Sequence, residues 1–196
     1  MTSRGRRRIR WTLASVWCSS ALAVLIAFAA PAARAGVFAS QDAALHAAFP
    51  DADRIEPHAY VLDDAQAARI RQLAEADLDR KVWTLHSAHR GAELLGYAIL
   101  DVRTVRTLPE ALLIVLAPDG SVRSVRVIAF HEPSEYQPNQ HFLEQMDGKR
   151  LSPELHLKRD IHGIAGATLS SQAVTRGVRT ALALYQVLIH DGAVAE

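Results

Sequence analysis

The clearest pattern of apolar and polar positions lies near the C-terminus, where apolar residues recur every three or four positions. This spacing places them on one side of a helix and predicts a long amphipathic helix that packs against a sheet. Weaker patterns of the same kind predict three shorter helices, over Asp42–Phe49, Asp63–Leu78 and Asn139–Met146. The stripe of the C-terminal helix consists of Val174, Val178, Ala181, Leu182, Tyr185, Leu188 and Ile189.

Between the predicted helices, four segments have the composition of β-strands. Ala111–Ala117 is continuously apolar, as in a buried strand, and Val122–Phe130 alternates between apolar and polar residues with one slip. The turn sequence Pro-Asp-Gly at 118–120 predicts that these two strands form a hairpin. Val82–Ser87 and Leu94–Val105 are the other two predicted strands. The order of elements indicates an α+β domain, with an antiparallel sheet packed against the C-terminal amphipathic helix and the shorter helices.

The first 35 residues have the features of an export signal. Five arginines within the first ten residues precede an uncharged, mostly apolar run from Trp11 to Ala30, and Ala33-Arg34-Ala35 offers a small-residue cleavage site. The run is also long enough for an uncleaved membrane anchor, which needs about 20 residues. We therefore expect a periplasmic or extracytoplasmic protein that is membrane-associated if the leader, residues 1–35, is retained.

The chain after the leader is long enough for one domain with its own core. We expect residues 36–90 to form an N-terminal helical and strand segment of that domain, and residues 91–192 to form its core. Residues 36–196 contain no cysteine, because the only cysteine of the sequence, Cys18, lies within the leader. This excludes several kinds of site. No disulfide, thiol nucleophile, thiolate metal ligand or c-type haem attachment is then available.

The leader also distorts the charge balance. It holds six of the 22 basic residues of the chain and none of the 21 acidic ones, so the rest of the chain has 16 basic residues, 21 acidic residues and a net charge of −5. Nucleic-acid binding depends on a basic face. We therefore expect no nucleic-acid partner.

The candidate chemistry lies in His162–Ser171, directly before the C-terminal helix. Its sequence, HGIAGATLSS, places small residues and then hydroxyl residues where that helix is predicted to begin. Small side chains let backbone N–H groups approach an anion, and a helix N-terminus favours negative charge, so the segment suits a phosphate. The Thr168 hydroxyl can also be esterified. A plainer alternative is that Ser170 and Ser171 only cap the helix.

The sequence Gly-Ala-Thr-Leu-Ser-Ser at 166–171 resembles the signature of the FMN-binding domain family. That family includes the small flavoprotein subunits of sodium-pumping NADH:quinone reductases and of Rnf-type complexes, and free-standing exported flavoproteins. The resemblance implies that a dedicated flavin transferase, using FAD, links FMN through a phosphoester to Thr168. It also implies a cofactor-binding corner made of Gly163, Gly166, Ala167, Leu169, Ser170 and Ser171.

The resemblance extends upstream to about Leu94, and residues 91–192 are therefore expected to be the core of an FMN-binding domain. Val125–Glu132, reading VRVIAFHE, is similar to the hairpin strand of the family and the polar element at its end. Phe142–Met146 and Gly148 also fit the layout of the family. Glu132 and the nearby Tyr136 are then candidates to line the edge of the flavin.

Two positions depart from the signature of the family. His162 stands where the family has an aspartate, and Ala165 stands where it has a serine or threonine. In the family these residues help the transferase to recognise its target. The departures leave two forms of FMN binding open, one through the ester to Thr168 and one without it.

Other kinds of site have less support in the sequence. The chain has nine histidines, and His86 and His89 lie three residues apart, but no acidic or thiol partner follows at the spacing of a metal site. No Gly-x-Ser-x-Gly elbow, Gly-x-Gly-x-x-Gly fingerprint or Walker loop is present. We therefore expect no metal site and no hydrolase or nucleotide-binding motif.

Three functions follow from these observations. The first is an exported electron carrier with covalent FMN, which exchanges electrons with a membrane-bound or periplasmic oxidoreductase. The second is a binding or assembly protein that keeps the fold without the cofactor, which the departures at His162 and Ala165 favour. The third is an FMN-dependent reductase of a small molecule. No acid or base for substrate chemistry is evident, so the sequence favours the carrier and leaves enzymatic activity undecided.

Overall fold

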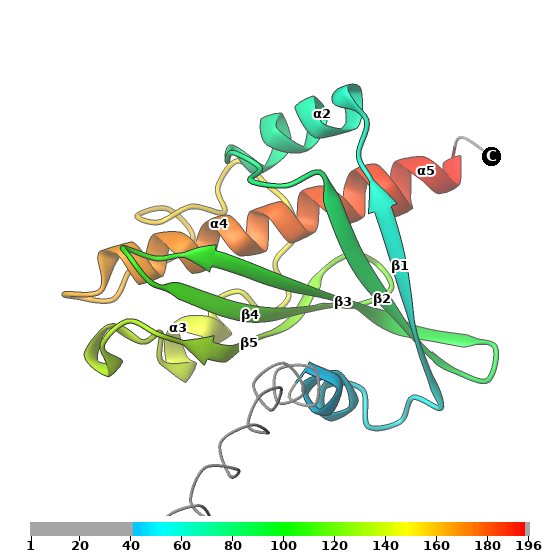
Figure 1. Ribbon diagram of the computed structural model, residues 1–196, viewed down its shortest axis with the longest axis horizontal. Helices are drawn as coiled ribbons and strands as arrows, with labels where there is room; N and C mark the ends of the chain where they lie inside the picture. Colours follow the sequence, from blue (N-terminus) through cyan, green and yellow to red (C-terminus); the bar gives the residue numbers. More distant parts are fainter. Residues whose placement is uncertain (1–40, 195–196) are drawn as a thin grey trace, which may run out of the picture. The chain divides into compact units, whose positions relative to one another are not determined.

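The protein is described by a computed structural model over residues 41–194, and the predicted leader, residues 1–35, lies outside this described part of the chain. A five-stranded antiparallel sheet has its strands in sequence order, β1-β2-β3-β4-β5 (Figure 1). This meander, together with the helices, confirms the predicted α+β class. The strands are β1 Arg54–Val61, β2 Val82–Arg90, β3 Glu93–Thr104, β4 Pro109–Leu116 and β5 Val122–Phe130.

The helices include the long C-terminal one that the apolar stripe predicts. This helix, α4, begins at Thr168, and a π-helical segment connects it to α5. Residues 41–48 are also helical, close to the predicted Asp42–Phe49. None of the helices in residues 41–194 is both long enough and apolar enough to cross a membrane. The named helices are α2 Asp64–Ala74, the 3-10 helix η1 Ser134–Tyr136, α3 Gln140–Glu144, α4 Thr168–Tyr185, the π-helix η2 Gln186–His190 and α5 Asp191–Val194.

The sheet is covered on both faces, which explains the continuously apolar sequence of β4. Leu112, Ile114 and Leu116 belong to the larger core, which they share with buried residues of α4. Leu113 and Val115 point to the other face, where a smaller core includes residues of the helical segment 41–48. All five of these side chains are fully buried. The alternation along β4 therefore fixes which face of the sheet receives α4.

The C-terminal half of α4 is fixed to the β4–β5 hairpin. The Tyr185 hydroxyl donates a hydrogen bond to the Pro118 carbonyl oxygen at 2.8 Å, and the ring packs edge-on against Tyr97, with centroids 5.5 Å apart. Gly120 has a φ of +80°, and a Cβ there would overlap the Tyr185 ring. The predicted Pro-Asp-Gly turn therefore serves the packing of the helix as well as the reversal of the chain.

Strand β1 is an element that the sequence patterns did not predict. Its residues are mostly exposed or half-buried, and Pro57 lies in its middle. It pairs only with β2 among the described strands, so it is an edge strand, where a proline is tolerated because one side of the strand needs no partner. Residues 54–90 thus supply β1 and β2 to the same sheet as β3, β4 and β5.

Helix α2 begins where its capping residue predicts and ends earlier than the apolar pattern predicts. The Asp63 side chain accepts from the Gln66 backbone N–H, and the Gln66 side chain accepts from the Asp63 backbone N–H, forming a capping box. The helix ends at Ala74, because Glu75 adopts a left-handed conformation with a φ of +52°. The predicted extension to Leu78 is therefore wrong.

Candidate functional site

The segment before α4 is a loop that side chains hold in place. The His162 backbone N–H donates to Gln145 Oε1 at 2.8 Å, and Gln145 Nε2 donates to the His162 carbonyl oxygen at 3.1 Å. The Ile164 N–H donates to Ser171 Oγ at 3.0 Å, and Ser171 Oγ donates to the Ala167 carbonyl oxygen at 3.0 Å. Ser171 is fully buried, so its part in the motif is to close this loop onto the helix.

The N-terminal end of α4 has unpaired backbone donors. The first helical hydrogen bond runs from the Ser171 N–H to the Ala167 carbonyl oxygen, at 3.0 Å. The N–H groups of Thr168, Leu169 and Ser170 precede that bond and have no helical partner. No side chain among the described residues caps the helix, and its capping position is occupied by Ala167. The alternative in which Ser170 and Ser171 cap the helix is therefore wrong, and this end suits an anion.

Gly166 gives the loop its turn into the helix. Its φ is +81°, in the left-handed region that residues with a Cβ rarely adopt. No described atom lies within 4 Å of the place where a Cβ would be, so backbone conformation and not space requires glycine here. Gly163, by contrast, has no positive φ and faces Ser171 in the closed part of the loop.

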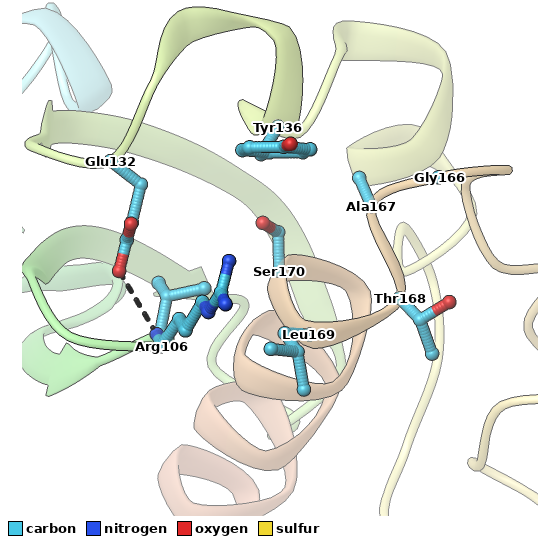
Figure 2. A pocket seen from close by; sticks show the side chains of 9 residues that line it. Arg106, Glu132, Tyr136, Gly166, Ala167, Thr168, Leu169 and Ser170 are labelled. Atoms are coloured by element: carbon cyan, nitrogen blue, oxygen red, sulfur yellow. Dashed lines mark hydrogen bonds between the residues drawn. The ribbon is translucent and has the colours of Figure 1, made fainter.

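A hollow of about 220 Å³, which we call the aromatic hollow, opens beside this end of α4 (Figure 2). Tyr136 covers one side of it, and the Ser170 side chain points toward Tyr136. Thr168 also lines it, but its side chain points away from Tyr136 and Arg106. The lining residues are Val105, Arg106, Glu132, Tyr136, Gly166, Ala167, Thr168, Leu169 and Ser170.

Glu132 shapes the aromatic hollow through the β3–β4 turn. Its Oε1 accepts hydrogen bonds from the backbone N–H groups of Arg106, Thr107 and Leu108, at 3.1, 2.7 and 2.8 Å. The bonds from Thr107 and Leu108, followed by that from Arg106, lower the pKa of Glu132. The carboxylate is thus ionised near neutral pH and holds the turn that carries Arg106 to the hollow.

A second hollow, of about 410 Å³, lies along α4 and also includes Thr168; we call it the basic hollow. Arg176, two turns after Thr168, and Lys158 are its exposed cations. Figure 2 shows the Thr168 side chain directed away from the aromatic hollow. Thr168 therefore lies at the boundary between an aromatic hollow and a basic one. The remaining lining residues are Ala74, Glu75, His156, Leu157, Gln172, Thr175 and Arg179.

Arg179 is the buried cation of the basic hollow, and its donors are committed to the protein. Only 2% of the residue is exposed, and it donates to the carbonyl oxygens of Leu73 and Ala74 at 2.9 and 2.8 Å. It also donates to the Ser152 carbonyl oxygen at 2.8 Å and to Glu75 Oε1 at 2.9 Å. Burial lowers its pKa. Arg179 thus fastens α4 to the end of α2, a structural role that leaves Lys158 and Arg176 to face a ligand.

The structure brings most of the predicted site residues together. Gly166, Ala167, Thr168, Leu169, Ser170 and Glu132 all line the aromatic hollow. Ser171 and Gly163 do not line it, and they belong to the closed loop. Within residues 41–194, no three His, Cys, Asp or Glu side chains are grouped as a metal site requires.

Sequence reasoning missed several residues at the two hollows. Val105 and Arg106 lie in a turn between strands, Lys158 and Arg176 line the basic hollow, and Gln145 reaches the loop from beyond α3. The only available signal was the position of Arg106 at the end of a predicted strand. The others are brought to the site by pairings between residues that are distant in sequence.

Comparison with protein families shows what these elements resemble. Residues 109–183 match the family model of the FMN-binding domain. The match covers β4, β5, α3 and nearly all of α4, and it includes Glu132, Tyr136 and the segment 166–171. The resemblance carried by the motif is thereby confirmed. Comparison with curated proteins gave no match.

Proposed function

From the match of residues 109–183 to the FMN-binding domain, we propose that this protein is an exported electron carrier with FMN attached through a phosphoester to Thr168. The observation that carries the proposal is the uncapped N-terminus of α4, with the exposed Thr168 side chain on its first turn. A phosphate there meets backbone N–H donors and the positive end of a helix. The donors and the threonine hydroxyl together fit the cofactor's phosphate.

The cations of the basic hollow support a position of the phosphate on that side of Thr168. The Thr168 side chain points away from Tyr136 and Arg106. Thr168 also lines the basic hollow, together with Arg176 and Lys158. A phosphodiester keeps one negative charge at neutral pH. Arg176 and Lys158 are exposed, so their contribution is an attraction screened by salt and not a buried ion pair.

The aromatic hollow supports the binding of a flat ring beside Thr168. Tyr136 offers an aromatic face, and Val105 and Leu169 offer apolar surface. Tyr136 and Leu169 remain 39% and 46% exposed, so both leave apolar surface open beside Thr168. Arg106 adds a cation at the edge of the hollow.

The open form of the aromatic hollow favours an electron carrier over an enzyme. Bound FMN supplies one- and two-electron transfer, and the protein supplies anchoring, exposure and electrostatics. Glu132, the carboxylate of the hollow, is committed to three backbone N–H groups and is not positioned as a proton donor to a substrate. We propose a flavin transferase as the maturation partner, and a membrane-bound or periplasmic oxidoreductase as the electron-transfer partner.

The departures at His162 and Ala165 do not disturb the loop. Both residues are exposed, and His162 is held through its backbone by Gln145 and not through its side chain. Neither of these two side chains therefore holds the loop in place. Any effect of the departures falls on recognition by the transferase, which leaves binding of FMN without the ester as the second form to test.

The test is the intact mass of denatured protein that was produced with its leader and a flavin transferase. We expect an increment of one FMN on the wild type and none on Thr168→Val. Thr84→Val is the matched control, because Thr84 is exposed on β2 and does not line either hollow. It should carry the same increment as the wild type.

The other outcomes separate the alternative functions. Colour that is lost on denaturation means FMN held without the ester. A colourless wild-type protein contradicts the carrier and favours a cofactor-free binding or assembly role. A coloured protein that reduces a soluble acceptor through many turnovers, with no partner protein, is a reductase instead.

A further inference from the structure

Glu110 is a buried acid that the proposed site does not use. It lies on β4 and is fully buried. Neither of its carboxylate oxygens has a hydrogen-bond partner among the described residues. A buried carboxyl group without partners is rare, because burial of a polar group costs free energy unless a hydrogen bond compensates for it. Such an exception requires a physical explanation.

The nearest cation is shared with another acid. Arg103 lies directly opposite Glu110 on β3, but its Nε donates to Asp101 Oδ2. Arg80 also contacts Asp101, at 3.3 Å. Burial raises the pKa of Glu110 to about 7, while Arg103 lowers it and Asp101 raises it. Glu110 is thus balanced between its charged and neutral forms near neutral pH.

Strand and helix geometry place Glu110 beneath the first turns of α4. A Cβ at Gly177 would lie 2.7 Å from Asp101 Oδ2 and 3.3 Å from Leu112 Cδ1, so α4 crosses the sheet there. Glu110 precedes Leu112 on β4 by two residues, so it lies about 7 Å from that crossing, toward the start of the strand. Ser170 lies seven residues back along α4, about 10 Å in the same direction. Tyr185 fixes this direction, because it packs at the other end of β4.

Glu110 is also connected to the aromatic hollow through the β3–β4 turn. It follows Leu108 by two residues, and the Leu108 N–H is one of the three that bind Glu132. A carboxylate at this position lies roughly 10 Å from a ligand in the hollow, by the length of an extended dipeptide and a side chain.

The other elements around Glu110 bring few further charges. On β5, Phe130 pairs with Glu110, and the next residue, His131, contacts the Pro109 carbonyl oxygen through Nδ1 at 3.1 Å. The carboxylate of Glu132 is committed to the turn. On α4, the residues above this part of the sheet, Ala173, Val174 and Gly177, are uncharged and buried. Arg103 and Asp101 are thus the two groups whose charges act on the Glu110 carboxyl, and His131 is the titratable group at the neighbouring end of β5.

We propose that Glu110 is a redox-linked proton site, which binds a proton when negative charge enters the aromatic hollow and releases it when that charge leaves. The inference rests on the proposed function for the source of the charge. When a one-electron donor reduces the flavin, the electron passes from the donor to the flavin. A proton from solvent then forms the O–H bond of Glu110, and both steps reverse on oxidation.

The size of the effect follows from the distance. One unit charge at roughly 10 Å, in a medium with an effective dielectric constant of about 20, shifts a titration midpoint by about one pH unit. Negative charge favours the neutral acid, so the shift is upward. Below the midpoint of the oxidised protein Glu110 is already neutral, and reduction then draws no proton to it.

The test is a carbon-13 NMR titration of protein labelled at the glutamate carboxyl carbons. The Glu110 signal is assigned by its absence from Glu110→Gln. It is then followed in apoprotein, in FMN-loaded oxidised protein and in loaded protein reduced with dithionite. We expect a midpoint near neutral pH in the apoprotein and a higher one after reduction, by about one unit. Glu93→Gln is the control, because Glu93 is exposed at the start of β3.

A midpoint at the ordinary value for glutamate, or one that does not move on reduction of a coloured protein, overturns the proposal. A colourless protein overturns the proposed function first, and the redox link with it. If Glu110→Gln does not fold, the flavin midpoint potential of wild-type protein is measured against pH. The same curve is recorded for free FMN in the same buffers. A change of slope near neutral pH that free FMN does not show supports the link, and a curve with the same slopes as free FMN contradicts it.

Discussion

The two ends of helix α4 differ in how completely the protein satisfies them. At the C-terminal end, Tyr185 is buried, its hydroxyl is bonded to Pro118, and its ring fills the space that Gly120 leaves. At the N-terminal end, Ala167 provides no cap, and Thr168 and Leu169 are exposed. One end stabilises the fold, and the other leaves donors and apolar surface for something that the chain does not supply.

Along helix α4, stability and function are thus assigned to opposite ends. A helix end without a cap loses roughly 1 kcal/mol relative to a capped one. The loss is tolerable here because the rest of α4 buries a wide apolar stripe, from Val174 to Leu184. We call the C-terminal end of α4, at Tyr185, the packed end, and its N-terminal end, at Thr168 and Leu169, the open end. The packed end stabilises the helix, so the open end is free to bind an anion.

Gly120→Ala should break the packed end, with the largest effect on stability. The substitution combines a left-handed φ with overlap between the new methyl group and the Tyr185 ring, which together cost about 4 kcal/mol. Urea denaturation measures the loss. FMN attachment should persist under conditions where the variant remains folded, because Gly120 lies at the opposite end of α4 from Thr168.

Gly91→Ala is the matched control for that measurement. Gly91 has a φ of +59°, but no described atom lies within 4 Å of the position of its Cβ. Its cost should be that of backbone strain alone, about 1 kcal/mol. Equal losses for the two variants would show that the Tyr185 contact contributes nothing, and would contradict the account of the packed end.

The packed end was also the part that the sequence predicted best. The apolar stripe of α4 repeats over many residues, and the β4–β5 hairpin has a turn signal between two apolar strands, so each prediction rested on several agreeing positions. Strand β1 was missed, because an exposed edge strand with a central proline has no alternating pattern to detect. At the early end of α2, the Ala74 carbonyl oxygen accepts a hydrogen bond from Arg179, 105 residues away, and no local pattern encodes such a pairing.

The open end was predicted only as far as its motif extends. Small residues, the threonine and the start of a helix are local features, and the segment 166–170 does line the aromatic hollow. Its walls come from elsewhere, since Arg106 arrives through the β3–β4 turn and Tyr136 through η1. The β3–β4 turn is held by three hydrogen bonds to Glu132, which lies 24 to 26 residues further along the chain. No local pattern encodes such pairings, so the hollow itself could not be predicted.

The buried acid beneath the open end should make stability depend on pH. The folded-state pKa of Glu110 is raised from 4.5 to about 7, so its contribution to stability is present below pH 4.5 and is lost as pH rises to 7. Relative to Glu110→Gln, the wild type should lose up to about 3 kcal/mol over that range. Urea denaturation at a series of pH values measures the difference. Parallel curves for wild type and Glu110→Gln would contradict the raised pKa, and Glu93→Gln should follow the wild type.

Gly166→Ala should break the open end with a small effect on stability and a larger one on FMN. Gly166 has a φ of +81° and open space around it, so alanine costs backbone strain alone, about 1 kcal/mol. Gly148→Ala is matched to it, with a φ of +74° and equally open surroundings, but Gly148 does not line either hollow. Both variants should lose similar stability in urea. Only Gly166→Ala should carry less FMN by intact mass. Alanine at 166 relieves its strain by rotating the backbone, and this rotation changes the direction of the N–H groups at the start of α4. Equal FMN content in the two variants would mean that the conformation of Gly166 serves the loop and not the cofactor.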